Sequence, residues 1–147
     1  MKNFNQFRLG NRVLIDERLL GTDMMEEGFI KEISGLQLKI KHRKSFIDYD
    51  CNSSQVYPIE LTDGVLVSLG FTNRSMVDST GTKIEDKVCT TDQIENSWYL
   101  LSIIEKNDKK FLTVYENGKD VIGSGFVNTL HKLQNLVFDI TDGKVQL

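Results

Sequence analysis

The chain has 147 residues, 39% of them hydrophobic, which is enough to bury one respectable core or two small ones side by side. Its net charge of −3 and its pI near 5.4 give no general attraction for nucleic acid, so any nucleic-acid role would have to come from a local patch and duplex binding is disfavoured. The longest apolar run, from Tyr99 to Ile104, is far too short to span a bilayer. Cys51 and Cys89 are isolated and follow no signal peptide, so we expect a cytoplasmic protein without disulfides or structural zinc.

The first sixty residues are typical of short strands joined by turns. Strands are predicted at residues 13–15, 28–33, 36–41 and 46–49, and the Ser34-Gly35 turn makes a hairpin of the second and third. Residues 36–41 alternate strictly, which predicts an inner face. That face contains Leu36, Leu38 and Ile40. The pattern predicts a small, strongly bent β-barrel-like sheet of the SH3-like kind, a class that more often docks partners than catalyses reactions.

A short helix is predicted next. The Thr62 hydroxyl can accept a hydrogen bond from the first turn, and Gly70 suits the left-handed conformation that ends a helix. We expect this helix to close the open end of the sheet, so that residues 1–71 form a first lobe. Residues 72–96 are rich in Ser, Thr, Asp and Asn, which predicts a long loop with one or two weak strands. The loop either carries part of a ligand surface or connects two lobes.

The remaining sequence predicts an antiparallel meander covered by a C-terminal helix. Residues 98–105 and 111–115 are rich in β-formers and flank a turn, and a short strand follows at residues 121–122. Apolar residues at helical spacing then predict a helix across one sheet face. These residues are Leu130, Leu133, Leu136, Val137 and Ile140. The predicted fold is therefore α+β, with a first lobe at 1–71 and a second at 72–147, packed as one compact unit.

Polar side chains on the other stripe of this helix are candidates for an interface. His131, Gln134 and Asn135 are expected to face solvent, a loop or a partner chain. The Gly123-Ser124-Gly125 segment before the helix has the spacing of neither a nucleophile elbow nor a phosphate loop, so it predicts a plain turn.

Three segments carry a resemblance to known proteins. They are FRLGNRV at residues 7–13, PIELT at 58–62 with the LGF that ends at Phe71, and LHKLQNLVF at 130–138. The chain resembles small proteins of unassigned function that are encoded by bacteriophages and mobile elements of gut bacteria. It departs from them at Val137, where an aromatic residue is usual, and at Asp139-Ile140, where they have Ala-Leu. The resemblance implies a phage or mobile-element protein that acts in the host cytoplasm.

The strongest local charge feature lies at the end of the third predicted strand and in the turn after it. It is either a solvated edge or a site for phosphate, and the acidity of the whole chain favours a small anion such as a nucleotide over a long duplex. Two arginines beside the Gly10-Asn11 turn are expected to converge on it, and the single tryptophan either stacks on a base or belongs to the core. The candidate ligand-binding residues are Arg8, Arg12, Lys41, His42, Arg43, Lys44 and Trp98.

Catalytic chemistry has few candidates in this sequence. Only His42 and His131 are available for a histidine-based centre, and neither lies in a recognisable motif. Asp48 and Asp50 share one face of a predicted strand, which either holds a hard cation or forms a solvated edge. We therefore expect no catalytic residues, no metal site and no cofactor.

Several functional hypotheses remain open. The first is a non-catalytic, homo-oligomeric binding protein with an anti-defence type of role, which sequesters a host nucleotide signal or binds a host protein. The second is a nucleic-acid-binding accessory protein that uses the basic hairpin, with a steep dependence on salt. The others are a virion adaptor and a metal-assisted hydrolase that uses Asp48 and Asp50.

Overall fold

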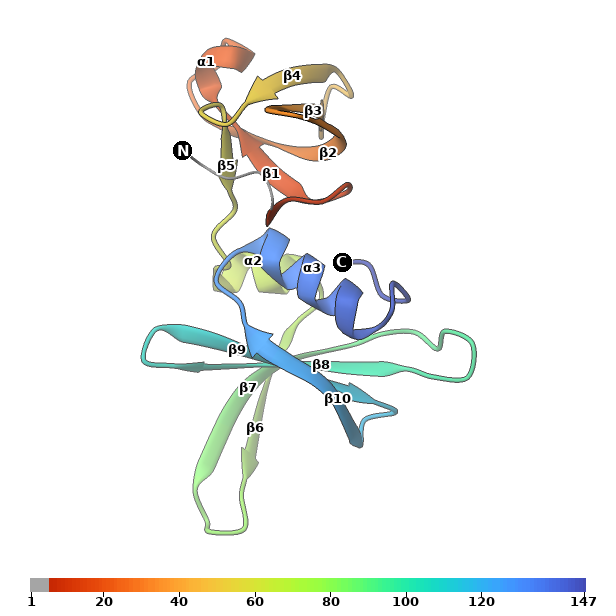
Figure 1. Ribbon diagram of the computed structural model, residues 1–147. Coiled ribbons are helices and arrows are strands. Elements are labelled where there is room, and N and C mark those ends of the chain that lie inside the picture. Colours follow the sequence, from red (N-terminus) through yellow and green to blue (C-terminus); the bar gives the residue numbers. More distant parts are fainter. Residues whose placement is uncertain (1–5) are drawn as a thin grey trace. The chain divides into compact units, whose positions relative to one another are not determined.

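The computed structural model describes residues 6–147, which form two five-stranded antiparallel sheets and three helices (Figure 1). The chain divides into two compact units, the first made of residues 1–60 and 129–135 and the second of residues 61–128 and 136–147. This mostly-β α+β architecture confirms the predicted fold class. The first boundary between the units falls after residue 60, whereas the sequence predicted it after residue 71. A second boundary falls inside the last helix.

The first unit contains a five-stranded sheet with the order β4-β3-β2-β1-β5. All four predicted strands are present, and β2 and β3 form the predicted hairpin, with Ser34 opposite Gln37. A short fifth strand pairs with β1. The elements are β1 (Arg12–Ile15), α1 (Glu17–Leu20), β2 (Glu26–Ser34), β3 (Gln37–His42), β4 (Asp48–Asn52) and β5 (Val56–Pro58).

The core of the first unit lies on the inner face of this sheet. Leu38 and Ile40 are fully buried, as the alternation predicts, but Leu36 is 71% exposed because it belongs to the turn that joins β2 to β3. Phe46 is also exposed and has a φ of 59°, so the fourth strand begins only at Asp48. Within the described residues the sheet does not close into a barrel, because β4 and β5 remain its two edges.

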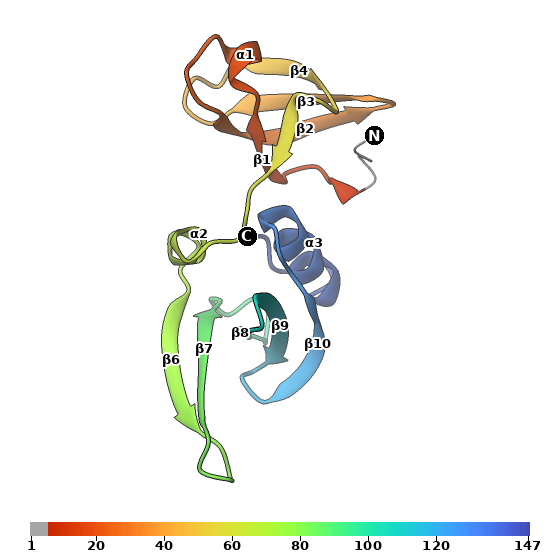
Figure 2. The ribbon, with the colours of Figure 1, turned by 90° about the vertical axis from the view of Figure 1, so that its left-hand side faces the viewer.

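The second unit contains a meander in which each strand pairs with the next along the chain (Figure 2). The three predicted strands are present. Residues 72–96, predicted as a long loop with one or two weak strands, instead form mostly a regular hairpin of two strands. Polar residues there bind each other across the hairpin, and their polarity concealed a regular structure. The strands are β6 (Thr72–Val77), β7 (Lys83–Thr90), β8 (Tyr99–Lys106), β9 (Lys109–Glu116) and β10 (Asp120–Phe126).

Two helices complete the described elements. Helix α2 (Asp63–Ser68) begins at Thr62, whose hydroxyl accepts a hydrogen bond from the N–H of Val65, as predicted. The C-terminal helix, α3 (Leu130–Ile140), also lies where the apolar spacing predicts it. No helix among residues 6–147 is long and apolar enough to cross a membrane.

The glycines of residues 123–125 do not form the predicted turn, because they belong to strand β10. A Cβ atom at Gly123 would lie 2.6 Å from the Ile140 side chain, and one at Gly125 would lie 2.9 Å from that of Leu136. Glycine therefore allows the last part of α3 to pack directly on the backbone of β10. The segment serves packing, which the loop-like composition did not reveal.

Candidate functional site

The basic residues at the end of β3 lie beside carboxylates from neighbouring strands. Lys41 Nζ is 3.9 Å from Asp48 of β4, and the His42 Nε2 atom is 3.1 Å from Glu26 of β2. Lys44 is 83% exposed and 4.0 Å from the same Glu26. The predicted anion site is thus a mixed surface in which Lys41, His42 and Lys44 each have an acidic neighbour.

Two of the predicted arginines do converge in the first unit. The guanidinium groups of Arg12 and Arg43 both bind Glu27 Oε2, at 2.7 and 2.9 Å. Burial raises the pKa of Glu27, but hydrogen bonds and charges from the two arginines outweigh burial and leave this pKa below its ordinary value. Of the two arginines that were expected to converge on the basic hairpin, Arg12 therefore meets Arg43, with a carboxylate of the chain itself between them.

Arg8 and Trp98 do not share this carboxylate. Arg8 is exposed in the turn before β1, where its backbone N–H donates to Asn11 Oδ1. Trp98 precedes β8 in the second unit and is 36% exposed, so it is not a core residue. Its ring lies against Gly118, where a Cβ atom would be 2.6 Å away.

The polar residues of α3 that were interface candidates face the first sheet. Gln134 accepts a hydrogen bond from the N–H of Arg12, and Asn135 accepts one from the side chain of Asn11. His131 is 1% exposed, and its ring lies 4.7 Å from that of Phe7. His131 and Gln134 thus have too little exposed surface to contact a partner chain, because they lie against Phe7 and Arg12.

The carboxylates considered for metal binding lie beside or opposite lysines of neighbouring strands. Asp48 lies 3.0 Å from Lys31 Nζ, and this hydrogen bond keeps the pKa of Asp48 below its ordinary value. Asp50 faces Lys39 across the β3–β4 pair. Within residues 6–147, no group of three or more His, Cys, Asp or Glu side chains is placed to hold a metal ion.

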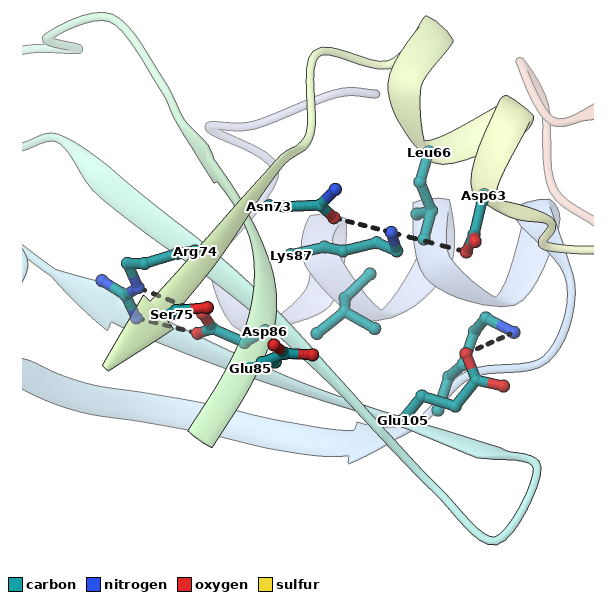
Figure 3. A pocket seen from close by; sticks show the side chains of 11 residues that line it. Asp63, Leu66, Asn73, Arg74, Ser75, Glu85, Asp86, Lys87 and Glu105 are labelled. Carbon is teal, nitrogen blue, oxygen red and sulfur yellow. Dashed lines mark hydrogen bonds and ion pairs between the residues drawn. The ribbon is translucent and has the colours of Figure 1, made fainter. Parts of the chain in front are cut away.

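A site that the sequence did not reveal lies in the second unit. Here α2 and strands β6 to β9 surround an open pocket of about 430 Å³ (Figure 3). Leu66 and Ile103 supply an apolar floor, and the other lining side chains are polar or charged. Pockets for small ligands are usually lined mainly by apolar side chains, so this pocket is unusually polar and suits a strongly polar ligand.

Lys87 is the central cation of the pocket and points across it in Figure 3. Its ammonium group donates to Asn73 Oδ1 at 2.8 Å and lies 3.5 Å from Asp63 Oδ1. Lys110 lies 3.6 Å from Glu105. Both lysine side chains are largely buried, at 22% and 17% exposure. Since an ammonium group has three N–H donors, each lysine keeps capacity for a further acceptor.

One wall of the pocket is fixed by a network around Asp86. Its carboxylate accepts two hydrogen bonds from Arg74, at 3.1 and 2.8 Å, and one from the Ser102 hydroxyl, at 2.6 Å. Burial raises the pKa of Asp86, but the hydrogen bonds from Arg74 and Ser102 outweigh it, so the pKa lies below its ordinary value. Asp86 is therefore ionised at neutral pH and holds the Arg74 guanidinium in one orientation.

Exposed carboxylates form the rim of the same pocket. The side chains of Asp63, Glu85 and Glu105 are 72%, 68% and 47% exposed. The arrangement thus offers cationic donors near the floor and anionic acceptors at the rim. Chemically it suits a ligand that has a phosphate or carboxylate at one end and hydroxyl or amino groups at the other.

The sequence contained one weak signal for this pocket. Residues 72–96 were considered as part of a ligand surface, and six of the lining residues do lie there. The pairing of β6 with β7 was missing from the prediction, so nothing indicated that residues 73–75 and 85–87 meet. No family model matches this chain, and no curated protein or solved structure is significantly similar to it.

Proposed function

We propose that this protein is a non-catalytic binding protein that holds a small phosphorylated ligand, such as a nucleotide, in the pocket of its second unit. The observation that carries the proposal is the pair of largely buried lysines, Lys87 and Lys110, in an open pocket of about 430 Å³. A phosphate accepts hydrogen bonds from such donors, and the pocket volume lies in the range that small ligands occupy.

The polar residues around these lysines support a nucleotide over inorganic phosphate. Carboxylates of Asp63 and Glu105 can accept hydrogen bonds from ribose hydroxyls, and the amide of Asn73 can pair with a base edge. Together with the resemblance to phage-encoded proteins, this supports sequestration of a host nucleotide signal as the role.

The basic hairpin supports the nucleic-acid alternative less well. Cations have acidic neighbours in both places, so the preference for the pocket rests on burial. Lys87 and Lys110 are 22% and 17% exposed, whereas Arg43 and Lys44 of the hairpin are 54% and 83% exposed. The first sheet keeps its SH3-like interpretation as a proposal, supported by β1, which pairs with both β2 and the last strand β5. Homo-oligomer formation also stays a prediction.

The proposal is tested by titrating the purified protein with a panel of ribonucleotides in a calorimeter. We expect one nucleotide class to bind and to be recovered unchanged by mass spectrometry. Lys87→Met should weaken its binding by about tenfold or more, because the variant loses a charge-assisted hydrogen bond. Lys119→Met is the matched control, since Lys119 is exposed in the β9–β10 turn and should leave binding unaltered.

Two results would contradict the proposal. Conversion of the bound nucleotide to a product would make the protein an enzyme. Binding that survives Lys87→Met and Lys110→Met at full strength would place the ligand elsewhere on the chain.

A further inference from the structure

A second surface of the second unit carries apolar side chains with no protein cover among the described residues. Phe126 of β10 is 70% exposed, and Ile104 of β8 is 38% exposed. Phe111 of β9 lies between them, because it pairs in register with both. The rings of Phe111 and Phe126 are 5.1 Å apart in an edge-to-face contact. The three side chains, here called the Phe126 surface, border a hollow of about 370 Å³.

The Phe126 surface lies on the sheet face opposite to α3. Alternate residues of a strand point to opposite faces, and the neighbours of these three residues are Ile103, Leu112 and Gly125. Ile103 and Leu112 are buried, and Gly125 lies under Leu136 of α3. The Phe126 surface is therefore separate from the core that lies beneath α3.

Charge complementarity indicates what binds there. Lys106 and Lys109 flank the Phe126 surface, face each other across the β8–β9 hairpin, and are exposed. Like charges at directly opposite positions destabilise a hairpin, and no carboxylate lines this hollow. Asp108 lies in the turn between them but does not line it. An acidic group from outside the chain would relieve this repulsion.

We propose that the Phe126 surface docks a segment of a partner protein in which acidic residues flank an aromatic or aliphatic anchor. The anchor covers Ile104, Phe111 and Phe126, and the acidic residues meet Lys106 and Lys109. Strand β10 is an edge of its sheet, so an extended segment also finds backbone donors and acceptors beside the Phe126 surface. This proposal does not depend on the ligand of the pocket.

Other occupants fit the same observations less well. A second copy of the chain would bring its own Lys106 and Lys109 to the lysines of the first, which adds repulsion. Single-stranded nucleic acid stacks on aromatic rings, but it needs a groove of cations along its backbone, and this hollow has two lysines. An acidic protein segment with an apolar anchor can both cover the aromatic rings and pair with the two lysines.

The test is selection from a displayed random-peptide library on the folded, full-length protein, followed by affinity measurement with fluorescein-labelled copies of the enriched peptides. We expect enrichment of peptides with acidic residues around a Phe, Leu or Trp. Phe126→Ser should weaken their binding by about tenfold or more, because it removes most of an aromatic contact. The double change Lys106→Glu with Lys109→Glu should do the same.

Lys119→Glu is the matched charge control and should leave peptide binding unaltered, and thermal unfolding verifies that each variant folds. Several results overturn the proposal: no enrichment, enriched peptides without acidic residues, or equal binding to wild type and to both surface variants. A labelled oligo(dT) that binds through Phe126 would make the site a nucleic-acid platform. A dimer lost with Phe126→Ser would make it a homo-oligomer face.

Discussion

His131 is the residue whose environment differs most from what its chemistry prefers. It is 1% exposed, and neither ring nitrogen has a hydrogen-bond partner among the described residues. Burial, with a smaller contribution from the charge of Lys132, lowers the pKa of His131 from 6.5 to about 4. The imidazole is therefore neutral in the folded protein at neutral pH, and protonation must work against folding.

The pH dependence of stability tests this environment. The folded pKa lies below the unfolded one, so the unfolded chain binds the proton first as the pH falls from 6.5 towards about 4. Wild type should lose up to about 3 kcal/mol of unfolding free energy across this window relative to His131→Leu, with no further loss below it. Urea unfolding of both proteins at several pH values measures the difference. Parallel pH profiles of the two proteins would contradict the lowered pKa of His131.

Asp86 permits a prediction at the same scale. Asp86→Ala should lower the free energy of unfolding by about 2 kcal/mol, because Ser102 is left buried without its acceptor and Arg74 loses both hydrogen bonds. The full cost of a buried ion pair is not expected, since the Arg74 side chain is 37% exposed. Asp120→Ala, at an exposed position, is the control for urea unfolding. Equal stability of the two variants would argue against the network.

Among the elements, strand β2 depends on a glycine that the sequence did not single out. A Cβ atom at Gly28 would collide with Cγ2 of Ile40 and lie 2.9 Å from the backbone oxygen of Lys41. The backbone of β3 cannot move away without breaking its pairing with β2 and β4. Glycine at position 28 is therefore required for the register in which β2 pairs with β3.

Two glycine-to-alanine changes test this point. Gly28→Ala should destabilise the protein by about 1 to 3 kcal/mol through overpacking. Gly64→Ala in α2 should be neutral or stabilise by up to about 1 kcal/mol, because its Cβ would meet only Thr62 Oγ1, at 3.9 Å, and alanine favours a helix. Thermal and urea unfolding provide the comparison. A Gly28→Ala protein as stable as the Gly64→Ala protein would contradict the close approach.

The elements also mark where pattern-based prediction fails. Apolar periodicity correctly predicted the meander strands and α3, because burial of one face imposes it. Strands β6 and β7 lack that periodicity, since Arg74 and Asp86, and Asn73 and Lys87, stabilise the pair through polar contacts. A polar hairpin has the composition of a loop, so the pocket that depends on it could not be predicted.

At the scale of the whole molecule, the first unit takes its last segment from the far end of the chain. Residues 129–135 belong to it, and Asn11 and Arg12 bind Asn135 and Gln134 at 2.9 and 3.0 Å. Contacts between residues so far apart in the sequence form late in folding, because a long loop must close first. The first sixty residues are thus an incomplete unit.

A fragment of residues 1–60 tests this organisation. We expect it to lack a stable fold, because it loses the hydrogen bonds of Gln134 and Asn135 and exposes Phe7, whose ring lies against His131 in the first unit. Its amide NMR spectrum should show poor dispersion, whereas the full chain should show the wide dispersion of a β-rich protein. A well-dispersed fragment spectrum would mean that the first sheet folds without residues 129–135.

The sequence by itself determined the α+β class, most strands, the Thr62 cap and the C-terminal helix, because these follow from local periodicity and turn chemistry. It also predicted that Arg8 and Arg12 approach the basic hairpin, but it could not show that Glu27 lies between Arg12 and Arg43. Only the tertiary structure decided where each charge finds its partner. The burial of His131, the lysine pocket and the Phe126 surface follow from the tertiary structure, because all three depend on residues that are distant in the chain.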